Sequence, residues 1–506
     1  MFDKFGSIER TYPAMVCKIL LVVVLFLSTT AAPHLLGLST AGFKSTRMES
    51  SKCGAERSVK DFGAVGDGRA DDTAAIQAAV KSGTGAVYFP KGDYRLTNTV
   101  VVDLNTRDKT SLVGTGAACV VMAGPGPAFH FVGTHEGTAN PDSVRDQVWD
   151  KERLPVITGI EIRGAHLESV GLRLEKTMQA TLTNLLVRRC KIGIELVKRN
   201  RNLIIDHCHI YHNRQVGIDF NQVNLHQAII SDSHISYNPA AGIRLLGGEM
   251  RNFQIVGNDI EYNYDPNNKG SADVLIDMTP KASSFREGTI VGNTIQARPS
   301  PGGANIRFLG GKNLRTGGLL TVTGNLIGSQ THNIHLADCR GVTISGNSLY
   351  SAAEHTLWLE NCANIVAANN TIDWNPDHKK KYLVDGILIT GCKGVIFSNT
   401  IIENSFQGSA QTGGAIDVRV SQDVVIVNCQ VLDFRFRGIT LTDAVRCRVT
   451  GCSVIERRQA PPAGASIQVK SGRDNLIADN IINRGGLSIA EGTATIRGNL
   501  EITSDN

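Results

Sequence analysis

Aromatic residues are scarce in this chain of 506 residues, since Phe, Trp and Tyr together make up only 6% of it. Glycine is frequent, with 52 residues, and Val, Ile, Thr and Asn recur in short runs. This composition favours many short β-strands joined by tight bends over a bundle of long helices.

The chain also lacks a basic tract. The formal net charge of +5 is small for this length, and no Lys/Arg stripe is interleaved with aromatic residues as in proteins that follow a nucleic acid strand. We therefore expect no nucleic-acid partner.

The sequence also has no apolar run long enough to cross a membrane. The run Ile19–Leu27 has only nine residues, too few to span a bilayer. A lysine precedes it and the small residues of Ser28–Ala32 follow it, which is the pattern of an export signal. We expect residues 1–32 to be a signal peptide and residues 33–56 a flexible segment, with the mature protein secreted, periplasmic or at the cell surface and not stably inserted in a membrane. A start at Met15 and a retained anchor are the alternatives.

From about residue 159 onward one sequence pattern recurs. It consists of a short apolar strand, a bend at Asn or Cys, a second short strand, a variable loop, and then Gly-Ile-x-Leu or an equivalent. Residues 342–349, Val-Thr-Ile-Ser-Gly-Asn-Ser-Leu, contain the bend. Recurrence every 18 to 35 residues without a helical period is typical of a β-solenoid. We predict an all-β fold, a single-stranded right-handed parallel β-helix of about 12–13 coils, as one domain over 57–506 with its main stack over 159–506.

The bends align in one column of Asn, Cys and Ser. Its members are Cys190, Cys208, Ser233, Asn258, Asn293, Asn325, Asn347, Asn370, Asn399, Cys429, Cys452, Asn480 and Asn499. Stacked amides can hydrogen-bond from coil to coil, so we expect a structural ladder. The eleven cysteines are odd in number and cannot all form disulfides. Cys339, Cys362 and Cys392 form another column, for which packed thiols are favoured over a metal because a straight column gives poor tetrahedral geometry.

Residues 57–132 are expected to form an N-terminal cap and the first coils. Asp72 or Thr73 would cap a helix whose apolar face holds Ile76, Ala79 and Val80. This helix would cover the open end of the solenoid, which otherwise exposes core and unpaired strand edges.

The same segment carries a family resemblance. Arg-Ser-Val-Lys-Asp-Phe-Gly-Ala-Val-Gly-Asp-Gly-Arg-Ala-Asp-Asp-Thr-Ala-Ala-Ile-Gln-Ala-Ala-Val at 57–80, followed by Gly-Ala-Val-Tyr-Phe-Pro-Lys-Gly-Asp-Tyr at 85–94, resembles the N-terminal segment of the pectate-lyase-like superfamily of rhamnogalacturonase/epimerase-type β-helices. The resemblance implies the fold. It implies no single activity, because the superfamily includes lyases, hydrolases, epimerases and phage tailspikes.

In each Gly-Ile-x-Leu strand the two aliphatic residues must face the core, so residue x points outward. Down the stack, x is Glu195, Asp219, Arg244, Leu275, Arg307, His335, Trp358, Leu388, Asp417, Thr440 and Gln468. The next outward positions add Asn221, Asp277, Glu360 and Arg419. One exposed face would thus carry carboxylates, guanidinium groups, an imidazole and an indole in register.

The loops before these strands are the longest in the chain, at 262–273, 298–304, 373–385 and 404–414. They would wall the face into a groove, and a groove with converging polar groups is the usual place for a site. In the superfamily that the chain resembles, the active cleft lies along this kind of face. Trp358 could stack on a sugar ring, and Glu360, Asp417 and Arg419 are the other candidates for substrate binding.

Hydrolysis is one reaction that fits these residues. It needs two carboxyl groups about 5 Å apart for retention or about 6.5–9.5 Å apart for inversion. Glu195 and Asp219 on adjacent coils suit the first spacing, and Asp219 with Asp277 the second.

Elimination or epimerisation of a uronate also fits. It needs a cation for the sugar carboxylate and a base for the ring proton. Arg244, Arg307 and His335 could supply these groups, with Asp219 or Asp277 orienting them or holding a calcium ion, the one candidate cofactor.

Each candidate also has a structural interpretation. Glu195, Asp219 and Arg244 could form a surface ladder of ion pairs. His335 beside Trp358 is the stronger functional pair, because an exposed indole next to an imidazole is uncommon on an idle surface.

A column of His209, His234 and Asp259 points outward from another face. Coils are spaced at about 4.8 Å, which is wide for ligands sharing one ion. We therefore expect stacked polar side chains there, and no metal site built from protein ligands.

The family motifs of specific activities are absent. The chain lacks the Asn-Thr-Asp, Asp-Asp, Gly-His-Gly and Arg-Ile-Lys set of polygalacturonase-type hydrolases, and Asp265-Pro266-Asn267 lacks the histidine of the Asp-Pro-His signature of alginate epimerases. We expect an exported lyase or hydrolase that cleaves an extended, acidic polysaccharide, as a monomer or a trimer. The alternative is a non-catalytic β-helix that binds glycan or acts as an adhesin.

Overall fold

The computed structural model describes residues 57–502 except 84, 268, 312, 378–385, 459–463 and 484. Residues Glu56–Asn506 form one compact unit, distinct from Met1–Ala55. The predicted signal peptide at 1–32 and flexible segment at 33–56 lie outside the described residues. In the part of the chain that is described, no helix has the length and apolar character needed to cross a membrane.

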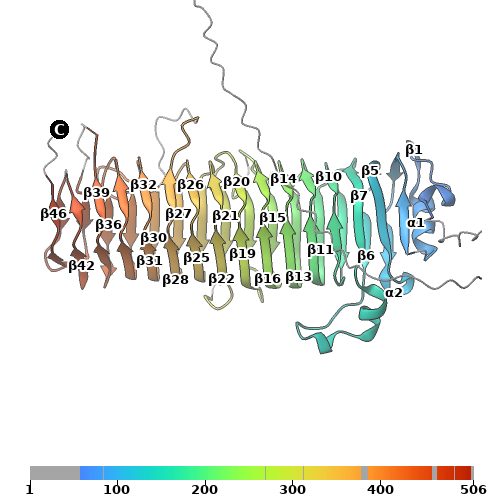
Figure 1. The fold of residues 1–506 in the computed structure, drawn as a ribbon, viewed down its shortest axis with the longest axis horizontal. Helices are drawn as coiled ribbons and strands as arrows, with labels where there is room; N and C mark the ends of the chain where they lie inside the picture. Colours follow the sequence, from blue (N-terminus) through green and yellow to red (C-terminus); the bar gives the residue numbers. More distant parts are fainter. Residues whose placement is uncertain are drawn as a thin grey trace, which may run out of the picture. The chain divides into compact units, whose positions relative to one another are not determined.

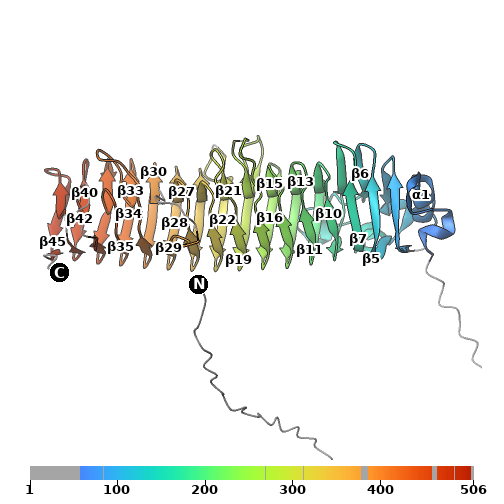
Figure 2. The same cartoon turned by 90° about the horizontal axis from the view of Figure 1, so that it is seen from above.

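The unit is a stack of coils whose strands pair in parallel with the coil before and the coil after (Figures 1 and 2). The 46 strands found in the described residues belong to one hydrogen-bonded sheet, which bends three times per coil and so presents three faces. The predicted all-β parallel β-helix is confirmed.

The first face contains the Gly-Ile-x-Leu strands. They are β4 (Val100–Asp103), β6 (Gly126–Val132), β8 (Ser169–Glu175), the first halves of β11 (Ile192–Asp206) and β13 (Val216–Ser231), β15 (Ala241–Leu246), β18 (Ala272–Asp277), β21 (Ala304–Leu309), β24 (His332–Ala337), β27 (His355–Glu360), β30 (Gly386–Thr390), β33 (Ile416–Arg419), β36 (Ile439–Thr442), β40 (Ile467–Val469) and β44 (Leu487–Ile489).

The second face follows it in each coil. It contains β2 (Ala86–Phe89), the first halves of β5 (Ser111–Met122) and β7 (Val156–Gly164), β9 (Thr181–Thr183), the second halves of β11 and β13, β16 (Glu249–Val256), β19 (Ser284–Val291), β22 (Gly318–Thr323), β25 (Arg340–Ser345), β28 (Ala363–Ala368), β31 (Lys393–Ser398), β34 (Gln422–Val427), β37 (Ala444–Val445), β38 (Arg448–Thr450), β41 (Gly472–Arg473), β42 (Asn475–Ala478) and β45 (Ala494–Arg497).

The third face closes each coil. It contains β1 (Asp67–Asp71), β3 (Gly92–Leu96), the second halves of β5 and β7, β10 (Leu186–Arg188), β12 (His209–Tyr211), β14 (His234–Ser236), β17 (Asp259–Glu261), β20 (Thr294–Gln296), β23 (Leu326–Gly328), β26 (Ser348–Tyr350), β29 (Thr371–Asp373), β32 (Ile401–Glu403), β35 (Gln430–Leu432), β39 (Ser453–Ile455), β43 (Ile481–Ile482) and β46 (Leu500–Glu501).

The helices are short. They are α1 (Thr73–Lys81), α2 (Leu104–Arg107), two 3₁₀ turns (Val59–Phe62 and Pro141–Ser143) and one π-helical turn (Val148–Glu152). The predicted cap helix is α1, and Ile76, Ala79 and Val80 are buried as expected. Asp72 is the N-cap residue, one of the two predicted, but its side chain makes no cap hydrogen bond. Its carboxylate instead accepts the backbone N–H groups of Val65 and Gly66 at 2.6 and 3.0 Å, and so holds the preceding loop.

The asparagine ladder runs along the corner between the second and third faces. Each side-chain oxygen accepts the backbone N–H of the previous ladder residue, as in Asn293 to Asn325 (2.9 Å) and Asn325 to Asn347 (3.0 Å). The amide groups also donate along the column, from Asn293 to Asn325 and onward. This confirms that the column is structural.

Two predicted members of the ladder are wrong. Thr400, not Asn399, takes the ladder position, because its hydroxyl accepts the N–H of Asn370. Asn399 instead adopts a left-handed conformation (φ 48°) at the corner that Gly346 (φ 64°) occupies elsewhere. Asparagine tolerates this conformation better than other residues with a side chain, so it can fill either of the two adjacent positions.

Cys190 belongs to a second ladder, at the corner after the third face. The backbone N–H of Cys190 donates to Asn213, which donates to Asn238, which donates to Asn263. Cys190 follows a strand of the third face and not of the second, a difference that the local sequence pattern does not reveal.

The second ladder ends at the fully buried Asp273, and amides converge on it from both sides. Asn263 donates to its Oδ1 and Asn305 to its Oδ2, at 3.1 and 2.9 Å, and Asn333 in turn donates to Asn305. Burial raises the pKa of Asp273 well above its usual range, against the opposing effect of these donors.

Cys339, Cys362 and Cys392 are buried and free, with the Cys362 N–H pointing at the Cys392 sulfur (3.4 Å). The packed-thiol interpretation is in keeping with these contacts.

Candidate functional site

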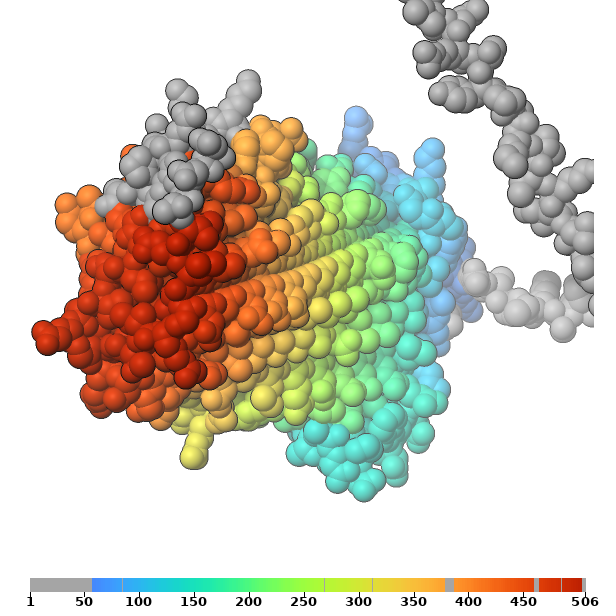
Figure 3. Space-filling view, turned by 60° about the vertical axis from the view of Figure 1, so that its left-hand side comes forward, coloured from blue at the N-terminus to red at the C-terminus, as the bar shows by residue number. Residues whose placement is uncertain are grey.

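The outward column of the first face exists in the predicted register. The residues pair one coil at a time from Glu195 through Asp219, Arg244, Leu275, Arg307, His335, Trp358, Leu388, Asp417 and Thr440 to Gln468. Such columns appear as parallel ridges along the solenoid (Figure 3).

The expected exposure of this column is wrong. Asp219 is 0% exposed, Asp417 1%, Glu195 5%, His335 7% and Arg307 8%. Two of the loops predicted to stand beside the face contact it: the Arg307 guanidinium donates to the carbonyl of Gly270 at 3.1 Å and to that of Gly302. The buried guanidinium thus supplies donors for backbone carbonyls of these loops. The alternation of residues along a strand does not predict such contacts.

The N-terminal part of the column is a ladder of ion pairs. Arg173 Nε lies 2.7 Å from Glu195 Oε2, and Arg244 donates to both oxygens of Asp219 at 2.9 and 2.7 Å. Burial raises the pKa of Asp219, and the bonds from Arg244 act in the opposite sense. Asp277 caps a turn, because its carboxylate accepts the N–H and hydroxyl of Thr279.

Two stacked rings form the centre of the column. The rings of His335 and Trp358 are 4.0 Å apart and inclined by 12°. Arg307 Nε donates to His335 Nδ1 at 3.2 Å, so the neutral imidazole carries its proton on Nε2. Burial, and then the charge of Arg307, lowers the pKa of His335 to about 3.

One nitrogen on each of these two rings has no hydrogen-bond partner. His335 Nε2 and Trp358 Nε1 are both buried and make no hydrogen bond. The nearest carboxylate oxygen to His335 Nε2 is that of Glu360, at 3.6 Å, beyond a good hydrogen bond. A buried N–H without an acceptor costs free energy, so both donors would gain from an acceptor that reached them.

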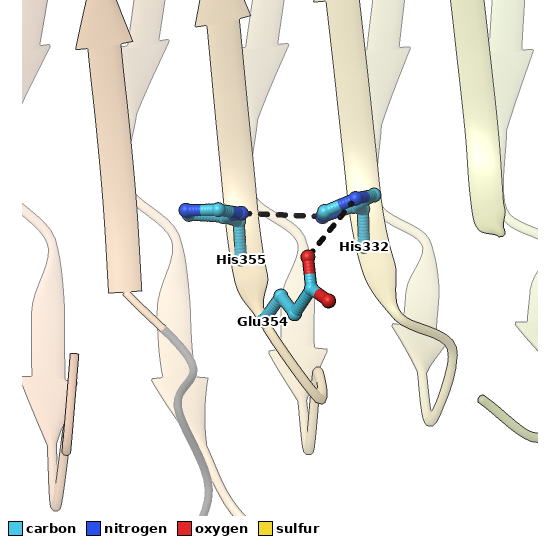
Figure 4. Close-up of side chains that lie close together, drawn as sticks. All are labelled: His332, Glu354 and His355. Atoms are coloured by element: carbon cyan, nitrogen blue, oxygen red, sulfur yellow. Dashed lines mark hydrogen bonds and ion pairs between the residues drawn. The ribbon is translucent and has the colours of Figure 1, made fainter. Parts of the chain in front are cut away.

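Three further residues next to these rings escaped the sequence analysis (Figure 4). His332 and His355 pair in register at the start of β24 and β27, and Glu354 precedes His355. The two Nδ1 atoms are 3.3 Å apart, and His332 Nε2 lies 3.7 Å from Glu354 Oε2. Their signal in the sequence is a histidine three residues before x in two consecutive coils.

The C-terminal part of the column holds another ion pair. Arg419 donates to Asp417 Oδ2 at 2.8 Å through Nε, and the Thr440 hydroxyl donates to Asp417 Oδ1 at 2.7 Å. The buried Asp417 is therefore saturated, whereas Arg419 is exposed on its outer side.

His332, Glu354 and His355 form the one group of three potential metal ligands among the described residues. The His209, His234 and Asp259 column stands in the predicted register, with the two rings 5.0 Å apart, but does not form such a group. Neither do Asp219 and Asp277, the candidates for a calcium ion.

Two adjoining hollows, of about 280 and 380 Å³, lie away from this column on the second face. They share Leu314 and Arg340, and no candidate residue lines them.

Comparison with known families agrees with this architecture. Residues 56–143 match the family described as rhamnogalacturonase A/epimerase, pectate lyase-like, and residues 148–271 and 378–505 match the right handed beta helix region. The chain belongs to the pectate-lyase-like superfamily of right-handed parallel β-helices. The handedness of this pectate-lyase-like β-helix is thus as predicted.

Curated relatives match only a short segment of the pectate-lyase-like chain. Alginate lyase 7 of Azotobacter vinelandii is 60% identical over 45 residues, which are 8% of this chain and 5% of that protein. Mannuronan C5-epimerase AlgE6 of the same organism is 44% identical over 71 residues, 13% of this chain and 8% of that protein.

Solved structures with similar folds share little sequence with it. The A-module of the A. vinelandii mannuronan C-5 epimerase AlgE4 is 16% identical, with a TM-score of 0.37 over 87% of this chain and 99% of that one. The Dettilon tailspike protein is 14% identical, with a TM-score of 0.45 over 86% and 68%.

Proposed function

We propose that this pectate-lyase-like β-helix is an exported enzyme that cleaves an extended, acidic polysaccharide, with the reacting sugar over His335 and Trp358. The observation that carries the proposal is the pair of buried ring donors, His335 Nε2–H and Trp358 Nε1–H, without acceptors. A sugar carboxylate or hydroxyl supplies the oxygens that these donors require.

The neighbouring side chains have distinct roles in this proposal. Glu360, the carboxylate nearest to His335 Nε2, is the proton-transferring residue. Arg307 is a positioning residue, because its bond to His335 Nδ1 keeps the proton on Nε2. Arg419, exposed on its outer side, would attract a uronate carboxylate.

The ion pairs narrow the reaction chemistry. Arg173 and Arg244 neutralise Glu195 and Asp219, so a hydrolytic pair built from these two carboxylates is disfavoured. The His335 and Glu360 pair serves elimination, in which one group removes a ring proton while another stabilises the carboxylate. We therefore favour a lyase over a hydrolase. The short matches to an alginate lyase and to mannuronan epimerases support an acidic polymer.

The export part of the proposal rests on the sequence of residues 1–32. We propose that the mature enzyme acts outside the cytoplasm.

The test is turnover of uronate-containing and neutral polysaccharides by the purified protein, followed by unsaturated-uronate absorbance and by new reducing ends. Both signals together indicate a lyase, and reducing ends alone indicate a hydrolase. Neither signal across the panel would refute cleavage and leave a uronate epimerase, which breaks no glycosidic bond, or a glycan-binding module.

Trp358→Phe tests the site, because it keeps an aromatic ring over His335 and removes the N–H together with the five-membered ring of the indole. Loss of one hydrogen bond to a charged group costs about 1.5–3 kcal/mol, or roughly 10- to 150-fold in kcat/KM. Trp374→Phe, at an exposed indole after β29, is the matched control and should leave turnover unchanged. Equal turnover in both variants would refute the assignment.

A further inference from the structure

His332 and His355 bring two imidazole nitrogens unusually close. Both rings extend from the same edge of the first face on adjacent coils, and their Nδ1 atoms face each other at 3.3 Å (Figure 4). Strands on adjacent coils are about 4.8 Å apart, so the rings lean toward each other. The His209 and His234 rings on the third face are also on adjacent coils, but meet edge to face at 83°.

The separation fits one tetrahedral ion. Bonds of about 2.0–2.1 Å from zinc to imidazole nitrogen place two ligand atoms roughly 3.3 Å apart. Without an ion the same distance is at the long end for an N–H···N hydrogen bond.

Glu354 can complete the set. Its carboxylate lies within 4.8 Å of both histidine ligand atoms. Its side chain is 59% exposed, so it can rotate toward the Nδ1 pair at little cost. Two imidazoles and one carboxylate with a fourth position open is the ligand set of a catalytic zinc site.

The chemistry of the ligands selects the ion. Imidazole suits zinc and its neighbours in the transition series, whereas calcium and magnesium prefer oxygen ligands.

We propose that His332, His355 and Glu354 bind a zinc-class divalent ion beside the ring pair of His335 and Trp358. The centroids of the His332 and Trp358 rings are 5.1 Å apart, so the ion would lie close to the ring pair. An ion there would hold an oxygen of the acidic sugar, and this part rests on the proposed function. Binding of the ion itself does not.

The test is isothermal titration of the full-length, metal-stripped protein with ZnCl₂ in the absence of polysaccharide. We expect one tight site, and a Co²⁺-loaded sample with the intense visible absorption of tetrahedral cobalt. Glu354→Gln should weaken Zn²⁺ binding at least tenfold, and His355→Ala should abolish the tight site. Because Glu354 is exposed, Glu354→Gln should fold normally, so it tests the site even if His355→Ala does not fold.

His234→Ala is the matched control, because it removes an imidazole that has a neighbour on the adjacent coil but does not face a ligand set. It should bind Zn²⁺ as the unchanged protein does. No tight site, equal affinity in the Glu354→Gln variant, or the same loss in His234→Ala would overturn the metal site. None of these results bears on polysaccharide turnover, which is measured separately.

Discussion

Asn325→Ala removes one amide of the asparagine ladder and should destabilise the solenoid strongly. The Asn325 Nδ2 group donates to Asn347 Oδ1 at 3.0 Å and to the carbonyls of Ile290 (3.0 Å) and Thr323 (3.1 Å). Its Oδ1 accepts the backbone N–H and the amide of Asn293, both at 2.9 Å.

The magnitude follows from the groups left behind. The variant leaves the backbone N–H of Asn293 without an acceptor, which costs about 1–3 kcal/mol, and removes the other bonds of the Asn325 amide, each worth about 0.5–1.5 kcal/mol. The Asn293 amide keeps the carbonyls of Ile255 and Val291 as acceptors. We expect the free energy of unfolding to fall by about 4 kcal/mol, a large part of the roughly 5–15 kcal/mol of a typical domain. The midpoint of urea unfolding, followed by circular dichroism, measures it.

Asn325→Ser is the informative comparison. Ser233 already holds a ladder position, where its hydroxyl accepts the N–H of Cys208 at 3.0 Å and donates to the carbonyl of Ser231 at 2.8 Å. Serine at 325 should therefore recover about half of the loss, because it satisfies the Asn293 N–H. If Ala and Ser cost the same, or if Ala costs under about 1 kcal/mol, the ladder bonds do not stabilise the coil as argued.

Three further predictions follow from particular side chains. Asp273→Asn should be tolerated far better than Asp273→Ala in thermal unfolding, because the amide oxygen still ends one of the two converging chains, whereas alanine leaves both the Asn263 backbone N–H and the Asn305 amide without their acceptors; equal midpoints would contradict this. Arg307→Lys should lower kcat about tenfold with little change in KM, because it frees the His335 tautomer without removing a substrate contact; a pure KM effect would mean that Arg307 touches the substrate. His135→Gln should reduce the loss of stability between pH 6.5 and 4: burial and Arg199 lower the pKa of His135 to about 4, so the folded state binds fewer protons than the unfolded state and loses stability as pH falls through this window; an unchanged pH dependence would contradict the assignment.

Much of the fold could be predicted because periodicity determines it. In each coil, residue x lies between two aliphatic residues that face the core. This alternation was enough to predict the register of the outward column from Glu195 to Gln468 correctly. The apolar face of α1 was equally legible. The corners were harder, since Asn serves both the left-handed position of Asn399 and the adjacent inward position of Asn370.

The site could be predicted only in part. His335 and Trp358 were found because they occupy position x. His332 and His355 were missed although they share a periodic position three residues before x, and Glu354 was missed because it lies in the loop before β27, where no period applies. Burial of Arg307 and Asp219 was missed for the same reason: it depends on non-repeating loops and on ion-pair partners that the local pattern does not specify.

Convergence of amide chains on Asp273 gives the polar interior a direction. Asn213, Asn238 and Asn263 donate toward Asp273 from one side, and Asn333 and Asn305 donate toward it from the other. The carboxylate is thus the acceptor at which two oppositely oriented chains terminate. A neutral amide at 273 can end only one of them, so the other would have to turn every side-chain amide around. If a coil were duplicated or lost, the two series of hydrogen-bonded amides would keep their opposite directions only if the coil with Asp273 stayed between them.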